Sequence, residues 1–341
     1  MKTLLLLALA ALTAIPGHAA TDFKADSTSF SYIPHLSLTL RPRAEWSTAT
    51  GDVRFKIRNS DLAVSGNILP SVAYYLRADY CAAGKFQVFD VWARVGLGRG
   101  FAVQAGQYRI PFGVESFRAP WNYYFINRSF MGKQMCNERS VGVKGMWTAP
   151  KLPLTAEFGV FNPTSYTDHS IWVRTVALGG KASYRVGNTT LTAGGLSTRP
   201  YDVRINFVDF CAQWQYSRWT VVGEYMYEHY TNSAHKAAHS YVAFADYKMP
   251  LRTPLFNRMS FQGRFDGLTA HSTGTPDEKG RLVTDNAARN RLTLGTTLSY
   301  VHASGRFLEL RANYEQFFYH HDYSPSPSDD NMATVELVLH F

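Results

Sequence analysis

Basic side chains gather in two parts of this sequence where they could attract anions. The first is the long stretch between positions 109 and 138, whose basic residues are Arg109, Arg118, Arg128 and Lys133. The second is an alternating run made of Arg54, Lys56 and Arg58. On a β-strand such a run would project its charges to one face, about 6.5 to 7 Å apart. A row of weak cationic sites suits conduction, since one deep well would trap the ion.

The elements that must position these side chains are predicted to be β-strands. Apolar and polar residues alternate in segments bounded by turn residues, which favours strands with one apolar face. Sixteen strands are predicted, at 35–46, 53–65, 71–81, 86–96, 100–108, 139–147, 154–161, 175–186, 189–197, 203–216, 219–230, 237–248, 256–267, 289–301, 306–318 and 331–341. Every second connection is short or turn-like, as at Gly187-Asn188 and Ser217-Arg218, and the long polar connections lie between them. This alternation is typical of transmembrane barrels, so we expect one all-β, antiparallel, closed barrel.

The stretch from Arg109 to Glu138 is the longest connection, and it is expected to fold into the barrel. A sixteen-stranded barrel leaves an aqueous channel. The stretch is rich in aromatic residues, namely Trp121, Tyr123, Tyr124, Phe125 and Phe130, which favours burial against the inner wall. With Val53, Phe55 and Ile57 facing outward, the basic run 54, 56 and 58 would face the lumen. The same phase places seven further basic residues on the inner wall, namely Arg77, Lys144, Lys181, Arg185, Arg258, Arg264 and Arg291. Of these, Arg77, Lys181 and Arg185 join the basic residues of the connection and of the run at 54–58 as candidate anion-contacting residues.

Both ends of the chain predict export to a membrane. Residues 1–19 are read as a signal peptide, with small residues at Gly17 and Ala19 and cleavage before Ala20. Its apolar core is too short for a membrane-spanning helix. The chain ends in an alternating strand that closes on Phe341, which resembles the final strand that the barrel-assembly machinery reads. The predicted organisation is therefore a signal peptide at 1–19 and a single outer-membrane barrel domain at 20–341.

Composition agrees with a secreted barrel and argues against several other classes. The chain has 20 Tyr, 22 Phe and 7 Trp, and only 18% of its residues are charged. Its formal charge is +9, and removal of Lys2 with the signal peptide leaves +8. In an exported barrel this excess is expected to line a passage rather than to bind nucleic acid. Cys81, Cys136 and Cys211 have no metal-type spacing and could form at most one disulfide, with no pair singled out.

Catalytic and metal-binding motifs are weak in this sequence. His320-His321-Asp322 and the pair of His235 and His239 could bind a metal, but they lie in or beside polar loops. The sequence has no Gly-x-Ser-x-Gly, His-Glu-x-x-His or phosphate-loop pattern. No cofactor and no metal site are therefore predicted, and the chain is not expected to be an enzyme.

A resemblance to a known family rests on residues around the long connection. These are Gly106-Gln107-Tyr108-Arg109-Ile110-Pro111-Phe112-Gly113-Val114-Glu115 and, further on, Phe125-Ile126-Asn127-Arg128-Ser129. They resemble a segment of the phosphate-selective porin O and P family, and similarity is best over residues 50–190. The resemblance implies a trimeric, sixteen-stranded outer-membrane barrel whose third outer loop folds inward and whose basic side chains draw anions through. It also implies a cluster of loop lysines for phosphate, and here this sequence departs, since Lys133 stands alone.

The expected function is passive diffusion of small hydrophilic solutes through an outer-membrane porin, with a preference for anions and with phosphate as a candidate solute. Its expected partners are outer-membrane lipid, small anions and two further copies of the chain. Two other classes stay open, a barrel enzyme of the lipase or protease type and a structural or adhesive barrel with an occluded lumen. A periplasmic β-sandwich is the alternative fold, but it leaves the asymmetry of the connections unexplained.

Overall fold

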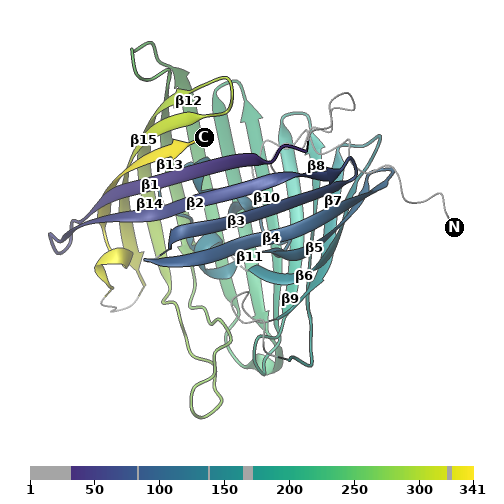
Figure 1. Ribbon diagram of the computed structural model, residues 1–341. Helices are drawn as coiled ribbons and strands as arrows, with labels where there is room; N and C mark the ends of the chain where they lie inside the picture. The colour runs from purple at the N-terminus through teal and green to yellow at the C-terminus, as the bar shows by residue number, and fades with distance from the viewer. Residues whose placement is uncertain (1–31, 83, 137–138, 164–171, 321–324) are drawn as a thin grey trace.

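A closed barrel of sixteen antiparallel strands forms the molecule (Figure 1). The computed structural model describes residues 32–82, 84–136, 139–163, 172–320 and 325–341. The predicted signal peptide therefore lies outside the described residues. The strands are β1 (His35–Ser47), β2 (Val53–Leu69), β3 (Val72–Ala82), β4 (Lys85–Gly98), β5 (Phe101–Arg109), β6 (Arg139–Thr148), β7 (Leu154–Phe161), β8 (Ala177–Val186), β9 (Thr189–Thr198), β10 (Ile205–Tyr216), β11 (Trp219–Tyr230), β12 (Ala238–Pro250), β13 (Arg258–Leu268), β14 (Arg289–Val301), β15 (Phe307–Tyr319) and β16 (Met332–His340). Each predicted strand is present, which confirms the sequence-based fold class.

The barrel closes between its first and last strands. β1 pairs with β16 from Thr39 opposite His340 to Ser47 opposite Met332. Phe341 continues this pairing, because its backbone N–H donates to Leu38 and its carbonyl accepts from the Leu38 N–H. Closure gives every strand two neighbours, so the described sheet has no open edge.

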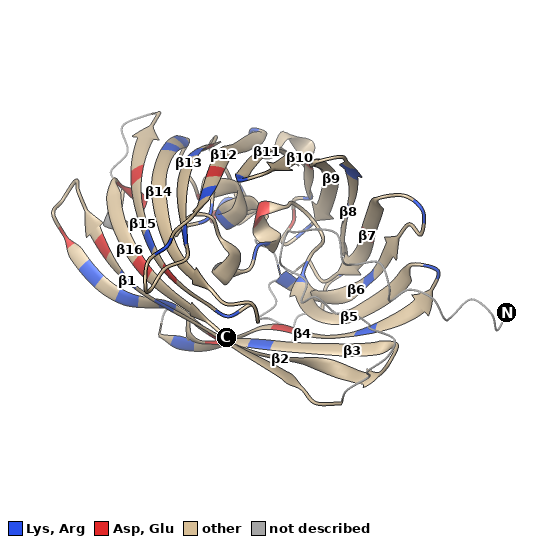
Figure 2. Cartoon of the chain, turned by 90° about the horizontal axis from the view of Figure 1, so that it is seen from above, with Lys and Arg blue, Asp and Glu red and all other residues tan. Residues whose placement is uncertain are grey.

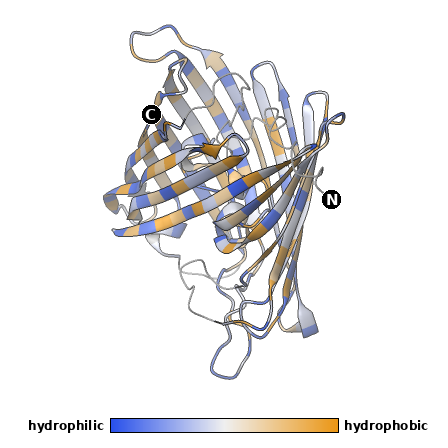
Figure 3. Ribbon diagram, turned by 45° about the vertical axis from the view of Figure 1, so that its right-hand side comes forward, coloured by the Kyte–Doolittle hydropathy of each residue, from blue (hydrophilic) through white to orange (hydrophobic). Residues whose placement is uncertain are grey.

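Hydrophobic and hydrophilic residues alternate along the strands (Figure 3), and many of the large apolar ones are exposed on the barrel. On β2, the outward Val53, Phe55 and Ile57 are all exposed, with Phe55 exposed by 81%. Trp219 of β11 and Leu294 of β14 are likewise exposed. The predicted outward phase of Val53, Phe55 and Ile57 is thus confirmed. None of the helices in the described ranges is long and apolar enough to cross a membrane.

One irregularity in β1 and β2 changes the phase of β2. The register shifts between Leu40 and Pro42, where a proline cannot donate to the ladder. On one side of the shift Glu45 lies opposite Arg54, and on the other side Thr39 lies opposite Asp61. The inner face of β2 therefore changes from even-numbered to odd-numbered residues. Arg58 lies at this shift.

The connection between β5 and β6 folds into the barrel, as predicted (Figure 2). It contains three short helical turns, η1 (Glu115–Phe117), η2 (Pro120–Asn122) and the π-helical η3 (Met131–Met135). Its aromatic rings pack on three separate strands. Between ring centres, Phe112 lies 5.5 Å from Phe207 of β10 and Phe125 lies 5.6 Å from Phe244 of β12. The ring centre of Phe130 lies 5.9 Å from that of Phe317 of β15. We call residues 110–136 the inward loop. The two remaining short helices, η4 (Thr231–Ser233) and η5 (Pro327–Asp329), lie in other connections.

Candidate functional site

A cavity of about 420 Å³ lies between the inward loop and the inner wall, and we call it the basic cavity. Its wall residues come mainly from the consecutive strands β3 to β10. Seven basic residues line it, namely Arg77, Arg94, Arg109, Arg118, Arg139, Lys144 and Lys181. Only two carboxylates, Asp90 and Glu157, are among the lining residues. The lining therefore has a clear excess of positive charge.

Asp90 serves two of the wall arginines at once. Its carboxylate lies 3.1 Å from Nε of Arg139 and 3.7 Å from Nη1 of Arg77. Arg77 also contacts Asp61 at 2.6 Å, a residue that does not line the cavity. All of these side chains are nearly buried. The two guanidinium groups thus share two carboxylates, which hold them in place and balance their charge, so the positive excess of the lining comes from its other basic residues.

The opposite wall holds two lysines around a single carboxylate. Lys144 Nζ lies 2.5 Å from Glu157 Oε2. Lys181 donates to the Gly113 carbonyl at 3.4 Å, and its ammonium lies 3.3 Å from the centre of the Phe117 ring. Lys181 therefore bridges the wall and the inward loop by a hydrogen bond and a cation–π contact.

Two arginines bring charge from the loop side of the cavity. Arg109 ends β5 and donates through Nη1 to the Arg118 carbonyl at 3.4 Å. Arg118 donates to Gln213 Oε1 at 3.4 Å, and its guanidinium stacks over Tyr124 and Phe244. Among the described residues, neither arginine makes an ion pair with a carboxylate. Their charge is therefore available to an anion in the cavity.

Wall side chains fix the inward loop by bonding to its backbone. Four wall arginines donate to loop carbonyls at 2.7 to 3.1 Å. Arg311 donates to Trp121, Arg41 to Ile126, Arg264 to Asn127 and Arg291 to Arg128. Wall carboxylates also accept from loop N–H groups, with Glu224 bound to Val114 and Glu115 and Asp266 bound to Phe130. Hydrogen bonds to charged groups contribute about 1.5 to 3 kcal/mol each. The loop is thus held at many points around the barrel.

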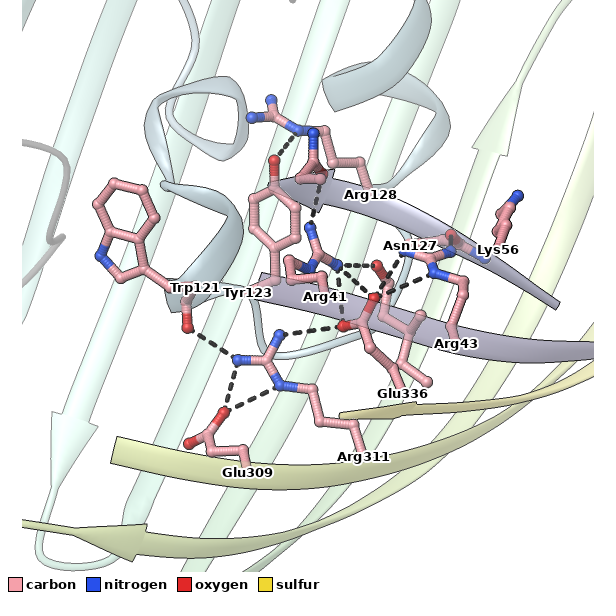
Figure 4. A network of polar contacts seen from close by, with 12 residues as sticks. Arg41, Arg43, Lys56, Trp121, Tyr123, Asn127, Arg128, Glu309, Arg311 and Glu336 are labelled. Atoms are coloured by element: carbon pink, nitrogen blue, oxygen red, sulfur yellow. Dashed lines mark hydrogen bonds and ion pairs between the residues drawn. The ribbon is translucent and has the colours of Figure 1, made fainter. Parts of the chain in front are cut away.

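A buried ion network at the closure of the barrel supports this attachment (Figure 4). Glu336 of β16 lies 2.9 Å from Arg41 and 2.8 Å from Arg43 of β1, and 3.7 Å from Arg311 of β15. Arg43 also donates to Asn127 Oδ1 of the loop at 2.9 Å. One carboxylate therefore connects three neighbouring strands with the inward loop.

Four of the ten predicted site residues line the basic cavity, namely Arg77, Arg109, Arg118 and Lys181. Arg128 does not line it, because its guanidinium binds the loop's own carbonyls at Ser116, Arg118 and Gly132. Arg128 also donates to the Tyr123 hydroxyl. Burial would raise the pKa of Tyr123, but the guanidinium groups of Arg128, Arg109 and Arg41 lower it below its ordinary value. Arg128 thus organises the loop.

Of the other five predicted residues, four lie towards the ends of the barrel and Arg58 lies at the register shift within β2. Arg54 and Lys56 contact Glu45 at 2.5 and 2.7 Å beside the 48–52 connection. Lys133 lies 3.6 Å from Asp329. At the opposite end, Arg185 donates to the Gly187 carbonyl of the tight turn. Arg58 is exposed at the register shift of β2.

Sequence reasoning missed two cavity residues, Arg94 and Arg139. It placed Lys144 on the inner wall by its phase, without counting it among the candidate site residues. Arg94 shares the inward phase of β4, so alternation alone could have identified it. Arg139 begins β6 and pairs with Arg109 across the two strands that flank the inward loop. Only the register of this pair shows that Arg139 reaches the cavity.

The cysteines and histidines show no sign of metal or disulfide chemistry in the described residues. Cys81, Cys136 and Cys211 are free. Burial, together with Glu224 and Glu115, raises the pKa of the Cys136 thiol. No group of three or more His, Cys, Asp or Glu is arranged for a metal within the described ranges, and His321 and Asp322 lie outside them.

Solved structures show which known proteins share this fold. The anion-selective porin of Comamonas acidovorans matches with a TM-score of 0.59 and 11% identity, over 91% of this chain and 99% of that one. The trimer form of OmpT, an outer-membrane protein of Vibrio cholerae, matches with a TM-score of 0.59 and 10% identity, over 91% and 99%. The outer-membrane channel DcaP of Acinetobacter baumannii matches with a TM-score of 0.58 and 12% identity, over 90% and 97%.

These matches identify the fold as that of outer-membrane porins. No family model matches the chain, and no curated protein matches it significantly. The resemblance to the phosphate-selective porin O and P family therefore rests on short sequence segments alone, and these comparisons do not confirm it.

Proposed function

We propose that this protein is an outer-membrane porin that lets small hydrophilic solutes diffuse through its lumen and favours anions. The observation that carries the proposal is the lining of the basic cavity, with seven Lys and Arg residues against two carboxylates. Arg109 and Arg118, which make no ion pair with a described carboxylate, contribute most directly. The porin fold and the apolar outer face support a location in the outer membrane.

The size of the electrostatic effect is sufficient for selectivity. An anion about 4 Å from one cationic side chain gains roughly 4 kcal/mol at an effective dielectric constant near 20, before its dehydration cost. Successive cations along the cavity would lower the energy of an anion at each step. A potassium ion would meet the same charges as a barrier.

The assembly and the solute are further parts of the proposal. We place the chain in a homotrimer, supported by the trimer form of the structural neighbour OmpT. Phe341 would serve as the signal for the barrel-assembly machinery. Phosphate is a less favoured solute, because Lys133 is the loop's lysine and it lies beside Asp329 rather than in the basic cavity.

A barrel enzyme and an occluded structural barrel are the alternatives. The basic cavity argues against occlusion, because the inward loop leaves about 420 Å³ open beside the wall. Single-channel conductance in a planar bilayer separates a porin from both alternatives.

The reversal potential in a potassium chloride gradient tests the anion preference. The wild-type channel should favour chloride over potassium. The double variant Arg109→Gln and Arg118→Gln should shift the potential towards potassium, because it removes two cavity charges that no described carboxylate neutralises. The matched control is Arg218→Gln, since Arg218 is exposed in the tight turn between β10 and β11.

The control variant should keep the wild-type potential. A wild-type channel selective for potassium, or a double variant with unchanged ion preference, would refute the anion preference. Absence of any conductance from folded protein would refute the porin proposal itself.

A further inference from the structure

Aromatic rings share the basic cavity with its cations. Tyr75, Trp92, Tyr108, Phe117 and Trp121 are among the lining residues. Conduction of chloride needs positive charge and water, and it gives no reason for large apolar rings on a wet surface. Apolar side chains with a few polar groups are typical of sites for organic molecules, and such sites measure roughly 300 to 1,000 Å³. The cavity, at about 420 Å³, falls in this range.

Two of the rings are held in fixed positions on the wall. Tyr75 of β3 lies opposite Trp92 of β4, and their rings stack with centres 5.4 Å apart. The guanidinium of Arg94 covers Trp92 at 4.6 Å, while its N–H groups donate to Gln104 at 2.7 and 3.0 Å. Arg94 is thus committed to positioning the ring.

A third ring enters from the inward loop. The carbonyl of Trp121 accepts a hydrogen bond from Arg311, and its indole points away from the ion network of Glu336 (Figure 4). The indole stacks on the His340 ring at 4.8 Å, and the Arg77 guanidinium lies 5.1 Å from it. The indole is therefore fixed before any solute arrives, so binding would cost little side-chain entropy.

We propose that the basic cavity is a binding site for small aromatic carboxylates, which are the preferred solutes of this channel. The carboxylate would pair with Arg109 and Arg118, whose charges no described carboxylate neutralises. The aromatic ring of the solute would contact Tyr75, Trp92 and Trp121. This inference rests on the proposed function, because the solute must enter through an anion-favouring lumen.

The charge and the rings together exclude two simpler solute classes. An inorganic anion would use the cations but would make no apolar contact with the rings that line the cavity. A neutral sugar would use the rings but would not offset the excess charge of the lining. An aromatic carboxylate satisfies both features, since guanidinium donors match a carboxylate and stacked rings favour a planar apolar body.

Block of the chloride current tests the site with three probes, namely benzoate, acetate and benzyl alcohol. Benzoate should half-block the wild-type current at a concentration about tenfold lower than acetate, because only benzoate adds a ring contact. Benzyl alcohol, which has the ring without the charge, should also require a higher concentration than benzoate. Equal block by benzoate and acetate, or by benzoate and benzyl alcohol, would overturn the proposal.

Single substitutions then locate the site. Trp92→Ala and Trp121→Ala should each raise the half-blocking concentration of benzoate about threefold to tenfold and leave that of acetate unchanged. Trp92→Phe keeps a ring and should retain most of the block. Trp214→Ala is the matched control, because Trp214 is exposed on β10 and does not line the cavity.

The chloride reversal potential separates this inference from the proposed function. A channel that favours chloride but shows no preference for benzoate over acetate would overturn the aromatic-carboxylate site and leave the anion-favouring porin intact. Benzoate block that Trp92→Ala and Trp121→Ala leave unchanged would also overturn the site. A wild-type channel that shows no preference for chloride over potassium would instead count against the proposed function.

Discussion

At the scale of single residues, basic side chains in this barrel have two different roles. Arg118 lines the basic cavity with no carboxylate partner in the described chain, whereas Arg128, only ten positions away, binds three loop carbonyls. Both are arginines in the same predicted segment, and nothing in their local sequence separates them. Their difference comes from the tertiary positions of Ser116 and Gly132. Charge counts from sequence therefore indicate a basic lumen without identifying the residues that a solute meets.

A buried histidine connects another loop to the wall. His271, in the 269–288 connection, is 2% exposed. Its Nε2 lies 3.3 Å from Glu228 Oε2, and the Asn286 amide lies 3.1 Å from its Nδ1. Burial lowers the pKa of His271 from 6.5 to about 4, although Asp285 acts in the opposite direction. The docked loop therefore holds a neutral histidine at neutral pH.

This environment predicts that acid loosens the 269–288 connection. The released loop binds a proton on His271 below pH 6.5, whereas the docked loop does so only near pH 4. The free energy that favours the docked loop is therefore greatest above pH 6.5. It decreases as the pH falls towards 4, by about 1.4 kcal/mol for each pH unit. Hydrogen exchange of residues 271–286, corrected for its intrinsic pH dependence, should show this loss of protection. His271→Gln should remove this dependence of protection on pH, whereas His302→Gln, in an exposed turn, should leave it unchanged. Protection that does not change with pH in the wild type would contradict the prediction.

At the scale of elements, alternation predicted the strands well because each strand has one apolar and one polar face. One strand end was predicted too early, at a glycine. The strand predicted at 53–65 stops before Gly66, yet β2 continues to Leu69. Gly66 pairs with Tyr74, and the Tyr74 hydroxyl occupies the space that a Cβ at Gly66 would need, at 2.7 Å. An aromatic residue across the ladder thus supports a glycine inside a strand, which the sequence of one strand cannot reveal.

The attachment of the inward loop also depends on more than one element. Arg41, Arg43 and Glu45 share one face of β1, so their inward phase was predictable. Their partners were not, because Glu336 and Ile126 are distant in sequence and meet only after the barrel closes. The inward fold of the loop followed from its aromatic content, whereas the residues that hold it followed only from the structure.

The ion network at the barrel closure gives a prediction for Glu336→Gln. The substitution leaves Arg41, Arg43 and Arg311 without a shared buried carboxylate, and breaking such a pair costs about 3 to 5 kcal/mol. The variant should lose its folded band at a lower temperature when heated in detergent. Its open-channel current should also be noisier, because Arg41 and Arg311 hold the loop backbone. Glu278→Gln, at an exposed loop position, is the control, and equal heat resistance of both variants would argue against the network.

At the scale of the whole molecule, the charge of the chain is distributed unevenly. Most wall arginines are paired, as in the clusters around Glu336 and Asp266, so they contribute little net field. The unbalanced charge is concentrated in the basic cavity. The excess of +9 in the full sequence predicted an anion preference, but only the pairing shows where that preference would arise.

This arrangement predicts how ion preference depends on salt. The Debye length is about 10 Å near 0.1 M salt and about 3 Å near 1 M, so dissolved ions screen the cavity charges more strongly at high salt. In gradients of equal ratio, the preference for chloride should therefore decrease between these two concentrations. It should not vanish, because Arg118, which makes no ion pair with a described carboxylate, is nearly buried and is screened less than an exposed charge. In the double variant Arg109→Gln and Arg118→Gln the salt dependence should be weaker, since fewer accessible charges remain to be screened. A chloride preference that stays constant with salt in the wild type would mean that pore size, rather than the charge of the basic cavity, selects the ion.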